Sequence, residues 1–361
     1  MPKSPAAMTT MRAFVTDGKK SGSVRDVDRP RPRPGQVLIK VHNAALNPGD
    51  WKLVEGNVAS DGAPEGLVVG FDFAGTVVQG PGWPRGQRVG GWTFGTNEGD
   101  TQRGAFAEYV TLEPSLLFPV PDNITMAQAS TVSLGYATAT LALYFTLGLP
   151  EPYQGGGGGQ QSLLVYGASS SVGLYAVQLG RLSGQRVIAV ASAKNHGLLK
   201  ELGADITVDY RDEDWVARVK EATQGGLRYA FDCIGQGGSA ESIAEILSPS
   251  DGAHLVALNP LDKDAICAIN PHIKAESIFA GACFGEPIDF IKAFDNIGGP
   301  TPEHKKAWET YLSWLPAMLQ KGDIVPNRVK EMGTLESVLE AFELSKAGKL
   351  SAEKAVFQVS M

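Results

Sequence analysis

The sequence is poor in the residues that make covalent cross-links and metal sites. Its 361 residues include only three cysteines, Cys233, Cys267 and Cys283, which are scattered without a Cys-x-x-Cys spacing. This excludes a disulfide framework and a four-cysteine zinc site, and it suits a reducing compartment, so we expect a cytoplasmic protein. The five histidines form no ligand pair along the chain: His42, His196, His254, His272 and His304.

The sequence also lacks an excess of positive charge and a long hydrophobic run. Its 32 Lys and Arg residues are outnumbered by 39 Asp and Glu residues, which gives a net charge of −7. A nucleic-acid surface needs clustered cations, so we expect no nucleic acid as a partner. Residues Met1–Thr10 contain no apolar core of a secretory signal. The most apolar segment, Leu134–Leu149, is short and carries several threonines, which predicts a buried helix and not a membrane span.

A glycine is missing from the segment around which the rest of the chain is organised, Leu163–Leu179. An apolar run of strand character ends at Gly167, small residues follow, and helix-forming residues resume at Leu174. A turn of small residues that leads into a helix N-terminus can hold the pyrophosphate of a dinucleotide, because that end offers N–H groups and partial positive charge. The dinucleotide fingerprint has three glycines, and Ser170 replaces the middle one. An ordinary buried strand, turn and helix is the alternative interpretation.

An acidic residue is missing after the next predicted strand, Arg186–Ala191. In a doubly wound sheet the end of this strand meets the adenine ribose, and NAD-selective sites place Asp or Glu there. This chain has Ser192, Ala193, Lys194 and Asn195 instead. A hydroxyl, an ammonium and an amide can bind a 2′-phosphate that a carboxylate would repel. We therefore predict NADPH over NADH, with a solvated loop lysine as the alternative for Lys194.

The first part of the chain contains short strands separated by glycine and proline. The run Arg29–Gly35 alternates arginine with proline, so it is neither a helix nor a central strand. The strand patterns lie at Met11–Thr16, Gln36–Ala44, Gly86–Gly91 and Gly104–Val110, with a strand pair over Val68–Val78. Several short strands with frequent turns predict a small, mostly antiparallel barrel that precedes an alternating α/β region.

Motifs in these segments resemble those of the medium-chain dehydrogenase/reductase superfamily. They are Asn47-Pro48-Gly49-Asp50-Trp51-Lys52, Gly70–Val77, Gly86–Val89 and Gly104–Tyr109. The resemblance covers nearly the whole chain apart from the first ten residues and the insert Gly155–Gly159, read as a flexible linker of unassigned role. It implies an α/β fold with a GroES-like catalytic domain over residues 11–150, a Rossmann NADPH-binding domain over 151–295 and a return to the catalytic domain over 296–361. Lys349–Phe357 would be the returning strand.

Further motifs look most like the stand-alone, trans-acting enoyl reductases of fungal polyketide pathways, such as the lovastatin enoyl reductase. They are Leu227–Ile234, His254–Pro260, Phe284–Glu286 and Leu350–Lys354. The resemblance implies NADPH-dependent reduction of an α,β-unsaturated acyl thioester on a polyketide synthase carrier domain, with hydride delivered to the β-carbon. Proline and charge in the predicted edge region Asp264–Ile278 favour a monomer. Two alternatives stay open: a quinone or enone reductase with small diffusible substrates, and a catalytically idle NADPH-binding interaction protein.

The zinc alcohol dehydrogenase branch of the superfamily needs Cys, His or carboxylate ligands that converge on the metal. That branch carries a ligand cysteine shortly after the strand ending near Ala45, where this sequence has Leu46–Asp50, and no cysteine precedes Cys233. His42 is isolated on a strand, which is typical of a packed or surface histidine. We therefore expect metal-independent hydride transfer.

The resemblance also assigns residues to the site. Reduction of an activated alkene needs a hydride donor, a group that binds the carbonyl oxygen as enolate charge develops, and a proton for the α-carbon. Lys52 and Thr138 are the catalytic candidates, with a surface lysine and a threonine bonded to its own backbone as the alternatives. Tyr136 is the weaker candidate for the proton donor, and bulk solvent is an alternative source.

The implied cofactor contacts come from the turns described above and from the ends of later strands. They are Gly49, Asp50, Trp51, Lys52, Ser169, Ser170, Ser171, Val172, Ser192, Ala193, Lys194, Asn195, Tyr210, Leu258, Asn259, Leu350 and Ser351. The implied substrate contacts are Ala137, Thr138, Ala139, Thr140, Leu141, Tyr144, Ala282, Cys283, Phe284 and Gly285. Tyr210 is alternatively a half-buried surface tyrosine, and Cys283, which has no base partner in the sequence, is more typical of an apolar filler.

Overall fold

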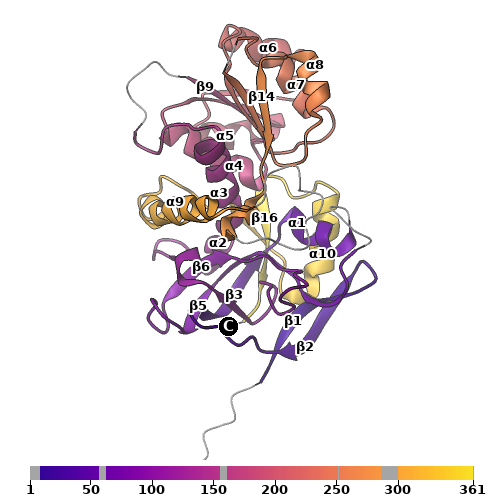
Figure 1. The fold of residues 1–361 in the computed structure, drawn as a ribbon, viewed down its shortest axis with the longest axis vertical. Helices are drawn as coiled ribbons and strands as arrows, with labels where there is room; N and C mark the ends of the chain where they lie inside the picture. The colour runs from indigo at the N-terminus through magenta and orange to yellow at the C-terminus, as the bar shows by residue number, and fades with distance from the viewer. Residues whose placement is uncertain (1–8, 57–61, 155–160, 251, 286–299, 361) are drawn as a thin grey trace, which may run out of the picture. The chain divides into compact units, whose positions relative to one another are not determined.

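A computed structural model describes residues 9–56, 62–154, 161–250, 252–285 and 300–360 (Figure 1). Packing divides them into two units. The first unit contains the described residues up to Leu134 and those from Pro326 onward, and the second contains the described residues from Gly135 to Val325. The predicted domain limits at 150 and 295 stay predictions. Residue 295 and the predicted linker Gly155–Gly159 lie outside the described residues.

The first unit is built on two sheets. In the smaller sheet β1 (Thr10–Asp17) pairs antiparallel with β2 (Gly22–Asp28) and β4 (Glu65–Val68). The larger sheet has the order β15-β16-β3-β5-β6-β8, with β7 also paired to β3, and β15–β16 is its parallel pair. Its strands are β3 (Val37–Ala45), β5 (Asp72–Gln79), β6 (Arg88–Trp92), β7 (Tyr109–Leu112), β8 (Leu117–Pro119), β15 (Arg328–Glu331) and β16 (Glu353–Gln358). This mostly antiparallel arrangement agrees with the prediction, and β16 is the predicted returning strand.

Gly70 lies between β4 and β5. The sequence predicts a strand pair over Val68–Val78, but these two strands do not pair with each other. The φ of 106° at Gly70 is open to glycine but rarely adopted by other residues, and a Cβ there would lie 2.5 Å from the backbone nitrogen of Phe106. The chain therefore changes direction at this residue. As a result β4 and β5 pair in different sheets.

Short helices cover parts of the first unit. They are α1 (Pro48–Glu55), α2 (Met126–Ala129) and α10 (Val338–Lys346), with single turns η1 (Pro114–Leu116) and η6 (Leu335–Ser337). α1 packs on α10, where the indole nitrogen of Trp51 donates to Ser345 Oγ at 3.1 Å. Lys346 also pairs with Glu55 at 2.7 Å. Residues near the two ends of the sequence thus form one layer.

The second unit is a doubly wound parallel sheet, as predicted. Its order is β11-β10-β9-β12-β13-β14, and every neighbouring pair is parallel. The strands are β9 (Ser162–Tyr166), β10 (Arg186–Val190), β11 (Ile206–Val208), β12 (Tyr229–Asp232), β13 (Ala253–Ala257) and β14 (Ile273–Ser277). The helices are α4 (Ser171–Leu182), α5 (His196–Glu201), α6 (Trp215–Thr223), α7 (Ser239–Ile246), α8 (Lys263–Ile269) and α9 (Pro302–Lys321), with η3 (Ala193–Asn195) and η4 (Ala280–Phe284). Fully buried Leu164, Ile188 and Leu255 form part of the core under this sheet.

The apolar segment predicted as one buried helix is divided in two. α3 (Ser133–Thr140) continues into a π-helix, η2 (Leu141–Thr146), and most of the segment is buried. In the part of the chain that the structure describes, no helix combines the length and apolar character needed to cross a membrane. Helix α9 was not among the predictions, and it buries Trp308, Leu312, Leu315 and Leu319.

Candidate active site

The turn between β9 and α4 has the geometry of a dinucleotide seat. Ser170 is the N-cap of α4, and its Oγ accepts the N–H of Gly173 at 3.0 Å. Its φ of −70° and ψ of 163° suit any residue, so serine replaces the expected glycine without strain. Gly173 must be glycine, because a Cβ there would lie 2.4 Å from the carbonyl oxygen of Gly167. The helix therefore begins close to the strand, as the close helix–strand packing of dinucleotide-binding turns requires.

The strand order places this turn at the switch point of the sheet. β9 lies between β10 and β12, which is where doubly wound sheets bind ligands at the carboxyl ends of their strands. The predicted groups Ser169–Val172, Ser192–Asn195 and Leu258–Asn259 follow β9, β10 and β13 respectively. Because these strands are parallel and in register, all three groups lie at the same edge.

The loop after β12 is a part of this edge that sequence reasoning missed. Asp232 is fully buried and accepts the N–H groups of Ile234 and Gly235 at 2.9 and 2.8 Å. The side chain of Asn259 donates to the carbonyl oxygen of Ile234 at 2.7 Å. Asn259, a predicted cofactor contact, therefore braces the loop with its side chain. An aspartate that ends an apolar strand is the sequence signal that marks such a loop.

Two further residues were missed beside the predicted adenosine end. Asp209 accepts the N–H of Ala193 at 2.9 Å and holds the guanidinium of Arg211 at 3.0 and 2.6 Å. The hydrogen bonds from Arg211 hold the pKa of Asp209 well below its usual range. Ser192 Oγ and the hydroxyl of Tyr210 lie 3.5 Å apart, and Tyr210 is exposed. The loops after β10 and β11 are thus joined through one carboxylate.

Lys52 lies on α1 in the first unit, and the N-terminus of this helix is stabilised by its own residues. The carboxylate of Asp50 accepts the N–H of the N-cap residue Asn47 at 2.7 Å, and Pro48 stands at the first helical position. Lys52 is half-buried, and this burial lowers its pKa. Its Nζ lies 5.8 Å from the centre of the Trp51 ring. The predicted ammonium is therefore present on an ordered helix and is partly desolvated.

A buried polar cluster lies beneath α1. Asp72 Oδ2 accepts Nζ of Lys354 at 2.6 Å and the side-chain amide of Asn47 at 3.0 Å, and Asp72 Oδ1 accepts the N–H of Leu134 at 2.8 Å. Asp50 is fully buried too, and desolvation raises its pKa well above its usual range. A charged residue inside an otherwise apolar strand is the sequence signal that marks Asp72 and Lys354.

Thr138 is buried in α3, and its neighbours Ala137 and Ala139 are fully buried. The hydroxyl of Thr140 donates to the carbonyl oxygens of Tyr136 and Ala137, each at 3.0 Å. The hydroxyl of Tyr136 donates to the carbonyl oxygen of Tyr311 at 3.0 Å, and burial raises the pKa of Tyr136 well above its usual range. Thr140 is thus bonded to its own helix and Tyr136 to α9.

The remaining predicted substrate residues lie in η2, in η4 and at Gly285, the residue that follows η4. Tyr144 is buried, and its hydroxyl donates to the carbonyl oxygen of Leu179 at 3.3 Å. Burial raises the pKa of the Cys283 thiol, which favours the neutral form. A neutral buried thiol packs like a small apolar side chain. Leu141 and Ala282 line one pocket of about 270 Å³ within the second unit. The structure therefore brings these last two residues together.

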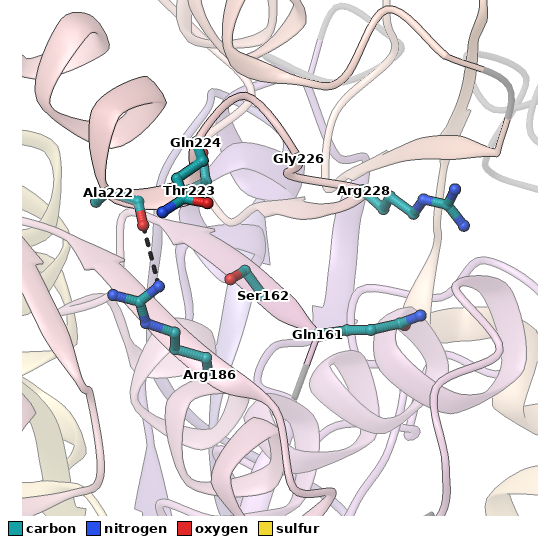
Figure 2. A pocket seen from close by; sticks show the side chains of 8 residues that line it. All are labelled: Gln161, Ser162, Arg186, Ala222, Thr223, Gln224, Gly226 and Arg228. Atoms are coloured by element: carbon teal, nitrogen blue, oxygen red, sulfur yellow. Dashed lines mark hydrogen bonds between the residues drawn. The ribbon is translucent and has the colours of Figure 1, made fainter. Parts of the chain in front are cut away.

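Another pocket of about 350 Å³ lies at the amino ends of β9 and β10 (Figure 2). It is bordered by Ser162 at the start of β9, Arg186 at the start of β10 and the last turn of α6. Arg186 Nη1 donates to the carbonyl oxygen of Ala222 at 3.0 Å, which satisfies a carbonyl at the helix end (Figure 2). This pocket is at the amino ends of the strands, away from the edge that carries Ser169, and we assign no cofactor to it.

The predicted residues are distributed over both units. The first unit holds Gly49, Asp50, Trp51, Lys52, Leu350 and Ser351. The second unit holds the other predicted cofactor residues and all the predicted substrate residues, Thr138 included. Among the described residues, no group of three or more His, Cys, Asp and Glu side chains could hold a metal ion. His42 is half-buried, and its Nε2 lies 3.1 Å from Thr76 Oγ1.

Comparison with known proteins agrees with the folds of both units. Residues 33–122 match the family model of the alcohol dehydrogenase GroES-like domain, and residues 171–298 match that of the zinc-binding dehydrogenases. A solved alcohol dehydrogenase superfamily protein from Novosphingobium aromaticivorans has a TM-score of 0.78 at 22% identity and covers 98% of this chain and 100% of its own. That likeness concerns the fold, and the predicted GroES-like and Rossmann architecture is confirmed.

Two curated relatives match over their whole length. A zinc-type alcohol dehydrogenase-like protein of Schizosaccharomyces pombe is 35% identical over 97% of this chain and 100% of the relative. A trans-enoyl reductase of Alternaria alternata is 31% identical over 98% of this chain and 100% of the relative. These relatives confirm the resemblance stated from the motifs.

Proposed function

Because the chain belongs to the medium-chain dehydrogenase/reductase superfamily, a family of oxidoreductases, we propose that it is an NADPH-dependent, trans-acting enoyl reductase. Its substrate is an α,β-unsaturated polyketide acyl thioester presented by a polyketide synthase carrier domain, and hydride goes to the β-carbon. The observation that carries the proposal is the 31% identity, over 98% of this chain, to a protein named as a trans-enoyl reductase. The dinucleotide turn at α4 supports it.

The cofactor part of the proposal is supported by the fit of the turn and the loops. The N-terminus of α4, with Ser170 as its cap and Gly173 packed against the strand, suits a pyrophosphate. The loop after β10 offers Ser192 and the exposed Lys194 to a 2′-phosphate and carries no acid. When bound, the reduced nicotinamide supplies the hydride.

The chain's own residues then bind and polarise the substrate. In our proposal Lys52 places its ammonium at the thioester carbonyl oxygen, where negative charge develops as the enolate forms. Thr138 adds a hydroxyl beside the substrate and nicotinamide. Tyr136 already donates its hydroxyl hydrogen to Tyr311, so we take water as the source of the α-carbon proton.

We also propose that the reaction is metal-independent. Within Leu46–Asp50, the segment where the zinc branch carries a ligand cysteine, Asn47 donates its side-chain amide to Asp72 at 3.0 Å. The carboxylate of Asp72 also binds the ammonium of Lys354 at 2.6 Å. This buried positive charge would repel a zinc ion bound beside it. The residues present therefore do not fit a catalytic zinc. Treatment with a chelator, followed by metal analysis, should leave both the activity and the fold unchanged, and a loss of activity that zinc restores would refute this part.

The test of the function is NADPH oxidation with one enoyl chain offered in several forms. The substrates are the enoyl thioester on a carrier domain, the same thioester on free pantetheine, a free enone and a quinone. We expect turnover of the thioesters, faster on the carrier domain, and loss of turnover in Lys52→Ala. Turnover of quinone or enone alone would favour a reductase of diffusible substrates, and NADPH binding without any turnover would favour an idle member of the fold.

A further inference from the structure

We propose that Arg211 binds the 2′-phosphate of NADPH and that Asp209 positions it. This inference rests on the proposed function, because it takes a phosphorylated dinucleotide as the cofactor. It adds a specificity-determining residue that is not among the predicted cofactor contacts. The argument depends on the geometry of one side-chain pair after β11.

Arg211 is held in a fixed orientation. Its Nε and Nη2 donate to the two oxygens of Asp209 at 3.0 and 2.6 Å, and its own backbone N–H donates to Asp209 Oδ1 at 3.0 Å. A guanidinium has five N–H donors, so three remain for another partner. The Arg211 side chain is 58% exposed whereas that of Asp209 is 9% exposed. The free donors of a permanent cation are therefore open to solvent on a restrained side chain.

The pair lies among the residues predicted to meet the adenine ribose. Asp209 also accepts the N–H of Ala193 at 2.9 Å, so the carboxylate connects Arg211 to the loop after β10. The guanidinium carbon of Arg211 lies 5.9 Å from the centre of the Tyr210 ring, and the Tyr210 hydroxyl is 3.5 Å from Ser192 Oγ. A phosphate bound by Ser192 and Tyr210 would come within reach of the guanidinium.

Charge explains why this arrangement favours a phosphate. An unpaired Asp209 would repel a dianionic 2′-phosphate near Ala193, as acidic residues do in NAD-selective sites. Arg211 cancels that charge and still presents N–H groups in the planar geometry that matches phosphate oxygens. NADH lacks the phosphate and gains nothing from this side chain. Arg211 therefore discriminates between the two cofactors without any contact to the nicotinamide.

The test uses two probes that differ only in this phosphate, 2′,5′-ADP and 5′-AMP, titrated calorimetrically into the full chain. We expect the wild-type protein to prefer 2′,5′-ADP and Arg211→Ala to lose about tenfold or more of that affinity, the scale of a charge-assisted hydrogen bond, with 5′-AMP unchanged. Arg218→Ala is the matched control, because Arg218 is also exposed and paired with an aspartate, Asp212, at 2.6 Å. It should bind both probes as the wild type does.

A double variant separates direct binding from simple neutralisation. In Arg211→Ala, Asp209→Asn the repulsive carboxylate is gone, so affinity for 2′,5′-ADP should recover only partly. Full recovery in the double variant would show that Arg211 only cancels the charge of Asp209. Equal losses of affinity for both probes in Arg211→Ala would show that Arg211 only stabilises the structure. Either result overturns the proposal, as does a wild-type protein without preference for 2′,5′-ADP. Failure of enoyl reduction with this preference intact would overturn only the proposed function.

Discussion

The ammonium of Lys354 lies 2.6 Å from the carboxylate of Asp72, and both side chains are almost completely withdrawn from solvent. The two residues are 282 positions apart in the sequence, on β16 and at the start of β5. The same carboxylate binds the N-cap residue of α1 and the backbone N–H of Leu134. One ion pair thus connects the returning strand to the helix that carries Lys52.

Removal of one partner of this pair should destabilise the protein strongly. Asp72→Ala leaves a buried ammonium without its counter-ion, which costs about 3–5 kcal/mol of unfolding free energy. The measurement is urea denaturation. The double variant Asp72→Leu, Lys354→Met removes both charges and should be much more stable than the single variant. Additive losses in the double variant would contradict a direct coupling between the two charges.

The pH profile of turnover should report the charge of Lys52. Burial lowers the pKa of Lys52, and only the protonated form stabilises an enolate. Turnover should therefore fall as pH rises through this lowered pKa, at a lower pH than an exposed lysine would give. Lys52→Arg keeps a permanent charge and should lose this alkaline limb, whereas Lys52→Ala should lower kcat by about 10²–10³. An unchanged limb in Lys52→Arg would assign the titration to another group.

Cofactor preference should respond to an acid after β10. Ser192→Asp places a carboxylate where NAD-selective sites have one, so KM for NADPH should rise and KM for NADH should fall. Ser192→Asn is the control, because it changes size without adding charge. A parallel change of KM for both cofactors in Ser192→Asp would show that the loop does not meet the ribose.

The first turn of α4 should be sensitive to a single methyl group. In Gly173→Ala the new Cβ would lie 2.4 Å from the carbonyl oxygen of Gly167, so cofactor affinity and thermal stability should both decrease. Gly197→Ala is the matched control in α5, where a Cβ meets no atom within 4 Å. That change should be neutral or stabilising by up to about 1 kcal/mol, because alanine favours the helix. Equal behaviour of the two variants would show that the turn is not tightly packed.

Much of the second unit could be predicted because its signals are local. Strands β9 and β10 are short apolar runs bounded by glycine or polar residues, and their predicted and observed limits agree closely. The split of Leu134–Leu149 into an α-helix and a π-helix was not predictable in this way. Both forms bury the same apolar residues, so hydrophobic periodicity does not distinguish them.

Two ion pairs of the structure could not be predicted from the sequence. Arg211 was visible beside Tyr210, but only its bidentate contact with Asp209 makes it a restrained cation. Asp72 and Lys354 were visible as charges within apolar strands, yet each would be costly to bury alone. Which charges meet depends on strand pairing between distant segments, and no local pattern encodes that pairing.

The sequence by itself determined the α/β class, the strand, turn and helix around Ser170, the absence of an acid after β10 and the family. These follow from side-chain periodicity, from backbone conformations open to small residues, and from motifs of adjacent residues. The tertiary structure alone decided that Asp72 is shared by Lys354, Asn47 and Leu134, and that Asp209 joins the loops after β10 and β11. The physical reason is that hydrogen bonds and ion pairs depend on distances in space, which the sheet sets by bringing remote strands into register.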